Sequence, residues 1–135
     1  MNLHQVPVIS IVDDDESVRE ATKSLIRSLG YKAVAFCSAE EFLESPHVTA
    51  TVCLITDVHM PGLSGVDLQD RLLAEGRRIP VIFVTAFLDE GLQARVLKSG
   101  AFGYLPKPFK EDRFIECLDA ALEAKARSLV LEATG

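Results

Sequence analysis

Short apolar runs rich in β-branched residues alternate along this sequence with segments whose apolar residues recur every three or four positions. The first run, residues 6–12, is almost continuously apolar and stops at three aspartates. Such a run predicts a strand buried on both faces, whereas the helical spacing of residues 17–29 predicts an amphipathic helix. The alternation occurs five times, and the other expected strands are residues 32–36, 51–56, 80–85 and 102–105.

The segments between these runs carry the signals of helix ends. Ser38 and Glu41 have the spacing of a capping box, and Gly30 and Gly76 are expected to end helices. Five strands alternating with five helices imply right-handed βαβ units, so the expected fold class is α/β, with a doubly wound parallel sheet covered on both faces. After the first helix, the others are expected to start at Ser38, to cover 66–74 and 88–98, and to run from 110 to about 129.

The length of 135 residues suits a single domain, because it supports one substantial core but not two. We expect that core at about residues 6–124, with residues 125–135 as a C-terminal tail or the start of a linker, helix-like to about Leu131. With 48% hydrophobic and 25% charged residues, the composition is that of a soluble globular protein. No apolar stretch approaches the roughly 20 residues of a membrane helix, and no signal peptide is evident, so we expect a cytoplasmic protein without membrane contact.

Charge and cysteine spacing argue against two classes of function. The net charge of -6 disfavours direct contact with nucleic acid, which requires a basic surface. The cysteines, Cys37, Cys53 and Cys117, are odd in number and have no cysteine or histidine partner at zinc-binding spacing. We expect reduced thiols buried in apolar surroundings.

Polar residues stand at the carboxyl ends of most of the predicted strands. In doubly wound sheets, ligands bind beyond these ends, near the point where strand order reverses. One such residue alone is ordinary, since loops after strands are polar, but the whole set is far less expected by chance. Asp15 and Glu16 are expected to start the first helix, where negative charge is favourable, rather than to bind metal. The set comprises Asp13, Asp14 and Asp15 after the first strand, Asp57 after the third, Thr85 after the fourth and Lys107 after the fifth.

The chemistry of this set depends on how its negative charges are balanced. If Asp13, Asp14 and Asp57 converge, two carboxylates about 4 Å apart repel by about 4 kcal/mol at an effective dielectric of about 20. A hard divalent cation with few protein ligands and several waters, the pattern Mg²⁺ prefers, would relieve that repulsion. Lys107 and the Thr85 hydroxyl beside it would bind the oxygens of a phosphoryl group, and Asp57 would be the nucleophile.

Four segments of the sequence resemble the receiver domains of two-component response regulators. They are Val-Asp-Asp at 12–14, Asp-Val-His-Met-Pro-Gly at 57–62, Val-Thr-Ala at 84–86 and Lys-Pro-Phe at 107–109. The resemblance extends from about residue 6 to 122, with the motifs in the family's order and spacing. The segments at 38–43 and 56–62 are most similar to receivers of transcriptional regulators that have a helix-turn-helix output domain.

The resemblance implies a flavodoxin-like fold with strand order 2-1-3-4-5 and a function as a phosphorylation-activated switch of a two-component phosphorelay. A sensor histidine kinase would supply the phosphoryl group, and Asp57 would accept it. The chain would promote its own phosphorylation and autodephosphorylation but turn over no external substrate. Asp14, Asp57 and the backbone carbonyl of His59 would ligate Mg²⁺, and Asp13 would help mainly through water.

The same resemblance implies how the switch works. Lys107 would pair with the phosphoryl oxygens, Thr85 would swing toward the phosphate, and the ring of Tyr104 would turn inward, although a strand aromatic is more often simply part of the core. These changes would alter the face built by the fourth helix, the fifth strand and the fifth helix, through which a homodimer would form. That face would control transcription through a domain outside this chain. The peptide bond between Lys107 and Pro108 is expected to be cis.

Two residues near the expected site point to control of hydrolysis. Phe87 is bulky and apolar where many receivers have small or polar side chains. We hypothesise that His59 and Phe87 together shield the acyl phosphate from water, whereas the family's use of the main chain at this position disfavours the His59 ring as a metal ligand. Gly65 is expected to relieve backbone crowding rather than to contact phosphate.

Three other functions fit parts of the pattern. A flavodoxin that binds FMN needs a phosphate-cradling loop after the first strand, but here that loop is three aspartates. A phosphatase of the haloacid dehalogenase type has a second aspartate two residues after the nucleophile, where this chain has His59. A degenerate receiver, which binds partners without phosphorylation, would not need the complete set of polar residues at the strand ends.

Overall fold

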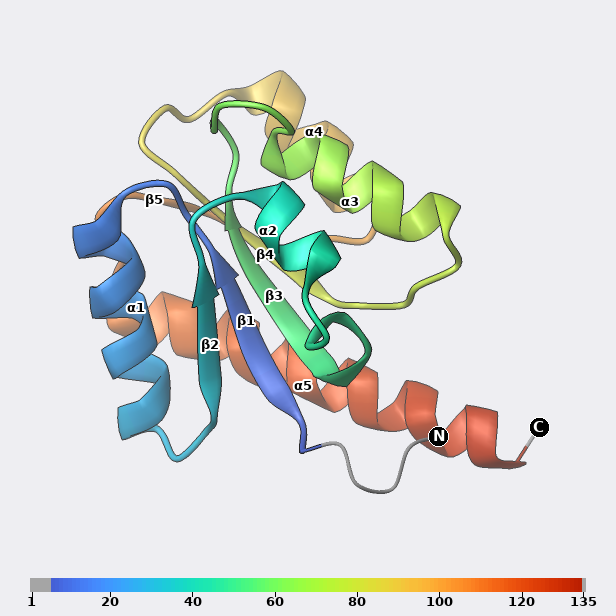
Figure 1. Ribbon diagram of the computed structural model, residues 1–135. Coiled ribbons are helices and arrows are strands. Elements are labelled where there is room, and N and C mark those ends of the chain that lie inside the picture. The colour runs from blue at the N-terminus through green and yellow to red at the C-terminus, as the bar shows by residue number, and fades with distance from the viewer. Residues whose placement is uncertain (1–5, 135) are drawn as a thin grey trace.

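Strands and α-helices alternate throughout the computed structural model, which describes residues 6–134 of the chain (Figure 1). All ten predicted elements are present, and a short 3₁₀ turn at Val48–Ala50 precedes the third strand. The elements are β1 (Val8–Val12), α1 (Glu16–Ser28), β2 (Ala33–Phe36), α2 (Ala39–Glu44), β3 (Thr51–Asp57), α3 (Gly65–Ala74), β4 (Val81–Thr85), α4 (Glu90–Lys98), β5 (Gly103–Pro106) and α5 (Glu111–Thr134).

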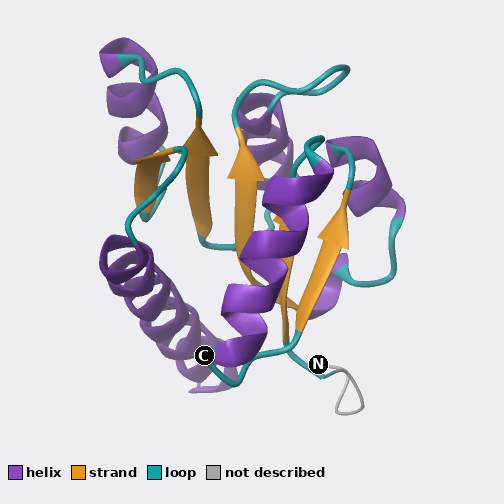
Figure 2. Cartoon of the chain, turned by 90° about the vertical axis from the view of Figure 1, so that its left-hand side faces the viewer, coloured by secondary structure: helices purple, strands orange, loops and turns teal. Residues whose placement is uncertain are grey.

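The five strands of the described chain form one parallel sheet in the order β2-β1-β3-β4-β5, which confirms the predicted fold class. β1 and β4 are buried along their whole length, because strands covered by helices on both faces must be apolar on both. Figure 2 shows the sheet between its helices. Since all strands run the same way, their carboxyl ends share one edge of the sheet.

Two layers of helices cover the sheet (Figure 1). α1 and α5 lie on one face, where Ile11 of β1 belongs to a buried cluster that includes Leu118 of α5. α2, α3 and α4 lie on the other face, where Val12 belongs to a cluster with Phe42 and Leu68. Neighbouring residues of β1 thus contribute to opposite layers, as the two-residue period of a strand requires.

Side-chain caps fix where the helices begin. Asp15 accepts a hydrogen bond from the backbone N–H of Ser17 at 2.9 Å, so it starts α1 as predicted. Ser38 caps α2 by accepting from the backbone N–H of Glu41 at 3.0 Å. The other half of the predicted capping box is absent from this part of the described chain, because the Glu41 carboxylate instead accepts from the Cys37 thiol at 2.7 Å.

The expectation that all three thiols are buried is wrong for one of them. Cys53 is buried and Cys117 is half-buried, but Cys37 is exposed. The physical reason is its position just past the end of β2, which is an edge strand and has less cover than the strands inside the sheet. The hydrogen bond to Glu41 raises the pKa of Cys37, and burial raises the pKa of Cys53.

The last helix is longer than predicted. α5 does not stop near Leu129 or Leu131 but continues through Thr134, and its end projects beyond the sheet in Figure 1. The residues after Leu129 include good helix formers and neither glycine nor proline before Gly135, so nothing in the sequence breaks the helix earlier. Among residues 6–134, no helix combines the length and the apolar character needed to cross a membrane.

The chain after β3 comes so close to the strand that only glycine fits at Gly65. A Cβ there would overlap the backbone carbonyl of Asp57, and it would also crowd the Phe83 ring. The Gly65 N–H donates to the carbonyl of Val58 at 2.9 Å. This crowding agrees with the prediction for Gly65, and it fixes the start of α3 next to the last residue of β3.

Candidate functional site

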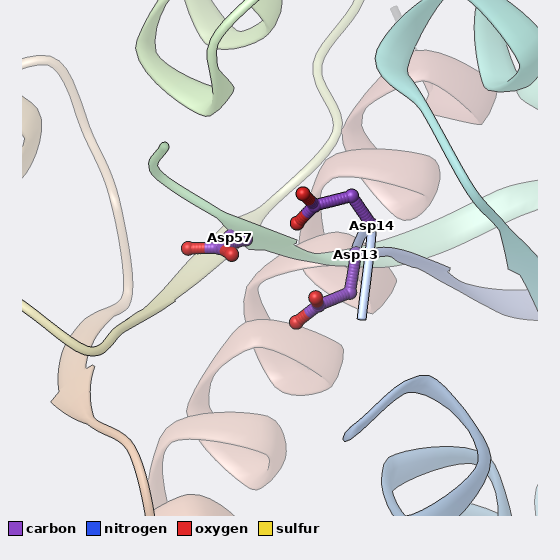
Figure 3. Close-up of side chains that lie close together, drawn as sticks. All are labelled: Asp13, Asp14 and Asp57. Carbon is purple, nitrogen blue, oxygen red and sulfur yellow. The ribbon is translucent and has the colours of Figure 1, made fainter. Parts of the chain in front are cut away.

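The ends of β1 and β3 bring three carboxylates together. These strands are neighbours, and Val12 pairs with Thr56 in their register, so Asp13 and Asp57 come next on adjacent strands. Asp14 follows on the loop after β1, and Figure 3 shows the three side chains side by side. One carboxylate oxygen of each aspartate lies within 4.8 Å of the other two. The convergence expected from the strand ends is therefore present.

The three carboxylates differ in their exposure to solvent. Asp13 is 3% exposed and Asp57 is 8% exposed, whereas Asp14 is open to solvent. Burial raises the pKa of Asp13, although hydrogen bonds from Lys107 and from the backbone N–H of Asp15 act in the opposite direction. The charged form of Asp13 is therefore disfavoured by the fold.

Lys107 directly follows the carboxyl end of β5 and brings a positive charge to two of these carboxylates. Its Nζ lies 2.7 Å from Oδ2 of Asp13 and 2.9 Å from Oδ2 of Asp57. Burial disfavours the charged ammonium, but the hydrogen bonds to the two aspartates outweigh this effect and raise the pKa of Lys107. The Lys107 backbone N–H donates to the Thr85 carbonyl at 2.8 Å, and the bond to Pro108 is cis, as expected.

Two contacts that orient Asp13 were not predicted from the sequence. Arg19 of α1 donates from Nη1 to the backbone carbonyl of Asp13 at 2.8 Å. The backbone N–H of Asp15 donates to Oδ1 of Asp13 at 2.9 Å. Together they tie the loop after β1 to the first turn of α1. No sequence signal separates Arg19 from the other charged residues of this amphipathic helix, such as Lys23.

Thr85 and Tyr104 have hydrogen-bond partners away from the carboxylates. Thr85 is fully buried, and its hydroxyl donates to the Phe87 carbonyl at 3.2 Å and accepts from the Phe87 N–H at 3.1 Å. Tyr104 lies in the core, where its hydroxyl accepts from the backbone N–H of Asp89 at 3.2 Å. Asp89 is the N-cap of α4, so both contacts lead from the end of the sheet to the start of α4.

His59 and Phe87 meet above the strand ends. Their ring centroids are 6.1 Å apart in an edge-to-face arrangement, and both side chains are exposed, Phe87 at 71%. His59 comes from the loop after β3, two residues beyond Asp57, and Phe87 from the loop after β4, two residues beyond Thr85. The structure therefore brings together the two residues that were expected to control access of water.

The donor set of the carboxylate cluster fits a hard divalent cation. Asp13, Asp14 and Asp57 carry three carboxylates, against which Lys107 supplies one positive charge. Carboxylate oxygens with an open side for water are the ligands that Mg²⁺ prefers. The exposed Asp14 provides that open side, whereas the buried Asp13 is less accessible.

A family model identifies this arrangement. The model, described as the response regulator receiver domain, matches residues 9–119, which include all three carboxylates, Thr85 and Lys107. The chain belongs to the response regulator receiver family. The observed strand order β2-β1-β3-β4-β5 is the one that the resemblance to receivers implied.

The relatives of this receiver domain are longer proteins. Nodulation protein W of Bradyrhizobium diazoefficiens is 40% identical over 116 residues, which are 86% of this chain and 51% of the relative. Response regulator protein TmoT of Ectopseudomonas mendocina is 41% identical over 119 residues, which are 88% of this chain and 54% of the relative. The chain thus spans about half the length of the curated relatives it matches.

Solved receiver structures share the fold. The low-resolution structure of response regulator StyR is 38% identical and superposes with a TM-score of 0.88, covering 96% of this chain and 65% of StyR. The crystal structure of FixJ-N is 34% identical and superposes with a TM-score of 0.77, covering 88% of this chain and 95% of FixJ-N. The chain therefore has the same architecture as these solved receivers.

Replacing Asp13 by asparagine should stabilise the metal-free receiver at neutral pH, because the raised pKa of Asp13 means that the fold disfavours its charged form. As the pH falls through this raised pKa, the wild type takes up a proton on folding and gains stability. The advantage of Asp13→Asn should therefore shrink and vanish below the ordinary value of 3.8. Urea unfolding at a series of pH values in EDTA measures this.

The control for that experiment is Asp119→Asn, which removes the same charge from an exposed position on α5. It should change the free energy of unfolding little at any pH. A lower stability of Asp13→Asn than of the wild type at neutral pH would contradict the expectation, because the ion pair with Lys107 would then outweigh the burial of the carboxylate.

Proposed function

We propose that this receiver is a phosphorylation-activated switch that accepts a phosphoryl group on Asp57 from a sensor histidine kinase. The observation that carries the proposal is the position of the Asp57 carboxylate. Its Oδ2 accepts from Lys107 Nζ at 2.9 Å, while within residues 6–134 its Oδ1 accepts no hydrogen bond. One oxygen is thus held in place by a positive charge, and the other is available to attack phosphorus.

The transfer would exchange one bond to phosphorus for another. Oδ1 of Asp57 would form the new oxygen–phosphorus bond as the phosphorus–nitrogen bond of the donor phosphohistidine breaks. The leaving imidazole nitrogen keeps the electron pair of that bond. Lys107, already 2.9 Å from Asp57, would neutralise negative charge on the transferred oxygens, which is the main requirement of phosphoryl transfer.

Mg²⁺ would be held by Asp14, by Asp57 and by the backbone carbonyl of His59, with Asp13 assisting mainly through water. Bound there, the ion would supply positive charge to the phosphoryl oxygens. The aspartates would contribute in two ways, by exchanging ligands with solvent and by holding one carboxylate in a fixed orientation. Asp14 is exposed and can exchange ligands with solvent, and the contacts of Asp13 with Lys107 and the backbone of Asp15 keep its carboxylate oriented.

The switch would follow from the two hydrogen bonds that lead to α4. A phosphoryl oxygen near Thr85 would compete for the hydroxyl that now donates to Phe87, and the release of Phe87 would change the loop that ends at Asp89. Because Asp89 also donates to Tyr104, the surface of α4, β5 and α5 would respond. A homodimer through this surface is part of the proposal, and light scattering of the phosphorylated receiver would detect it.

The output would be transcription, through a DNA-binding domain outside this chain. Support comes from the lengths of the relatives and from names such as transcriptional regulatory protein FixJ, which belongs to a protein 32% identical to this chain. The receiver itself, with a net charge of -6, would make no direct contact with nucleic acid. It would act in the cytoplasm and would catalyse only its own phosphorylation and dephosphorylation.

The exposed pair of His59 and Phe87 would set the lifetime of the phosphorylated state. Their rings meet edge to face at 6.1 Å, from the two loops that flank the phosphoacceptor. Hydrolysis of the acyl phosphate requires water to approach in line, and a bulky apolar ring at this position would limit that approach.

Incubation with acetyl phosphate and Mg²⁺ should add one phosphoryl group to the receiver, measured as a gain in intact mass. The gain should disappear in Asp57→Asn and when Mg²⁺ is omitted, because both remove a component of the site. Asp15→Asn, which preserves the cap of α1 and lies outside the carboxylate cluster, is the control and should be phosphorylated. A folded, Mg²⁺-binding protein that gains no mass under any condition would instead be a degenerate receiver.

Truncation of Phe87 should shorten the lifetime of the phosphorylated receiver several-fold, because water then has freer access to the acyl phosphate. The decay of the phosphorylated mass after removal of acetyl phosphate measures it for Phe87→Ala. Leu88→Ala is the matched control, since Leu88 is also exposed, at 62%, but has no ring to pack on His59. An unchanged lifetime in Phe87→Ala would show that the ring does not shield the phosphate.

A further inference from the structure

The loop that follows β1 carries two of the three clustered aspartates, and a side chain of α1 holds this loop. Arg19 donates from Nη1 to the backbone carbonyl of Asp13 at 2.8 Å. Among residues 6–134, that carbonyl accepts no backbone hydrogen bond, so Arg19 is the partner that fixes it. The carbonyl belongs to the peptide unit that leads into Asp14, so Arg19 also restricts the rotation of that unit.

The loop that follows β3 is closed in a different way. There the backbone N–H of Gly65 donates to the carbonyl of Val58 at 2.9 Å. This bond needs no side chain, whereas the loop after β1 depends on the guanidinium of Arg19. Replacement of a single side chain should therefore loosen the loop after β1 and leave the loop after β3 as it is.

Asp14 depends most on this arrangement. It is exposed, and within the described chain its carboxylate accepts no hydrogen bond. The contacts of its two neighbours therefore determine where it lies. On one side Arg19 holds the Asp13 carbonyl, and on the other side Asp15 is held as the cap of α1 by the N–H of Ser17, at 2.9 Å.

The Arg19 guanidinium does not neutralise the carboxylates that lie near it. In the part of the chain that the structure describes, it forms no ion pair, and Lys107 pairs with Asp13 and Asp57 instead. Arg19 thus leaves the Asp14 carboxylate open to other ligands. Its positive charge nevertheless lies close to the cluster, because Nη1 is 2.8 Å from the Asp13 backbone, and this charge repels a cation.

We propose that Arg19 is a positioning residue that strengthens Mg²⁺ binding by holding the peptide unit between Asp13 and Asp14. The inference rests on the proposed function, because it takes Asp14 as a ligand of the ion. Residues that orient metal ligands without touching the metal change its affinity by about tenfold or more. The proposal requires that this effect of geometry exceeds the electrostatic repulsion between Arg19 and the cation.

The two effects of Arg19 have opposite signs, so Arg19→Ala separates them. Calorimetric titration of Mg²⁺ should show about tenfold weaker binding by Arg19→Ala than by the wild type, because the loop is no longer held. On grounds of charge alone, loss of a positive charge beside the site would strengthen the binding of a cation. The direction of the change therefore distinguishes positioning from charge.

Three further variants support this comparison. Lys23→Ala is the matched control, because it removes the same charge from the same helix, where Lys23 lies 2.9 Å from Glu20, and it should bind Mg²⁺ like the wild type. Arg19→Lys keeps the charge and a donor and should recover part of the affinity. Arg19→Met keeps a long side chain without either and should bind as weakly as Arg19→Ala. Alanine and methionine both favour helix, so α1 should remain folded, which urea unfolding checks.

The Mg²⁺ dependence of phosphorylation by acetyl phosphate gives a second readout. Arg19→Ala should need about tenfold more Mg²⁺ than the wild type to reach half of its maximal rate. At saturating Mg²⁺ it should reach the rate of the wild type, because Asp57 and its contact with Lys107 are unchanged. A residue that contributed only to the stability of the fold would not shift the Mg²⁺ requirement of the folded protein.

Two results would overturn the inference and leave the proposed function intact. One is Mg²⁺ binding by Arg19→Ala and Arg19→Met that is as tight as, or tighter than, that of the wild type. The other is a lower maximal rate of phosphorylation with an unchanged Mg²⁺ requirement. Failure of the wild type itself to bind Mg²⁺ would overturn the proposed function and, with it, this inference.

Discussion

Three carboxylates at one edge of the sheet, two of them paired with a single lysine, are the constraint on which the rest of this receiver depends. The neighbouring positions of β1 and β3 force Asp13 beside Asp57, although like charges repel. Lys107 compensates from β5 at 2.7 and 2.9 Å, but one ammonium leaves the cluster net negative. The cluster therefore remains short of positive charge. Burial of the Asp13 carboxylate, more than repulsion from Asp57, raises the pKa of Asp13 and so adds to the cost of its negative charge. A site of this kind responds strongly to a cation or to a change in its own charge.

The connections around the cluster explain how such a change would be transmitted. Lys107 is joined through its backbone to Thr85, and the Thr85 hydroxyl is joined to both backbone groups of Phe87. Two residues further on, Asp89 caps α4 and contacts the Tyr104 hydroxyl. These contacts form a continuous chain of hydrogen bonds from the strand ends to α4. The bond that a phosphoryl oxygen would replace is the one from the Thr85 hydroxyl to the Phe87 carbonyl, at 3.2 Å. A continuous chain of contacts does not by itself show that two sites are energetically coupled. The proposed switch therefore rests on the exchange of one hydrogen bond, the one that the Thr85 hydroxyl donates.

The sequence predicted those features that are determined by residues close together in the chain. Buried β-branched runs, helix caps such as Asp15 and the strand-end aspartates all lie where expected, because each follows from the residues at that position. Strand order came only through resemblance to the receiver family. Features that depend on contacts between different segments were missed: the Arg19 contact with the Asp13 backbone and the exposure of Cys37 at a sheet edge. The extra length of α5 was missed for another reason. The lack of glycine and proline after Leu129 allows a helix to continue but only weakly predicts that it does.

Calorimetric titration of Mg²⁺ into the receiver tests most directly whether the three carboxylates form one cation site. The wild type should bind a single Mg²⁺, and Asp14→Asn should bind it at least about tenfold more weakly, because one charged ligand is lost. Asp14 is exposed, so its replacement should leave the fold intact. Asp15→Asn removes the same charge one residue away, outside the cluster, and should bind Mg²⁺ like the wild type. Equal loss of affinity in both variants, or no binding by the wild type, would contradict the account.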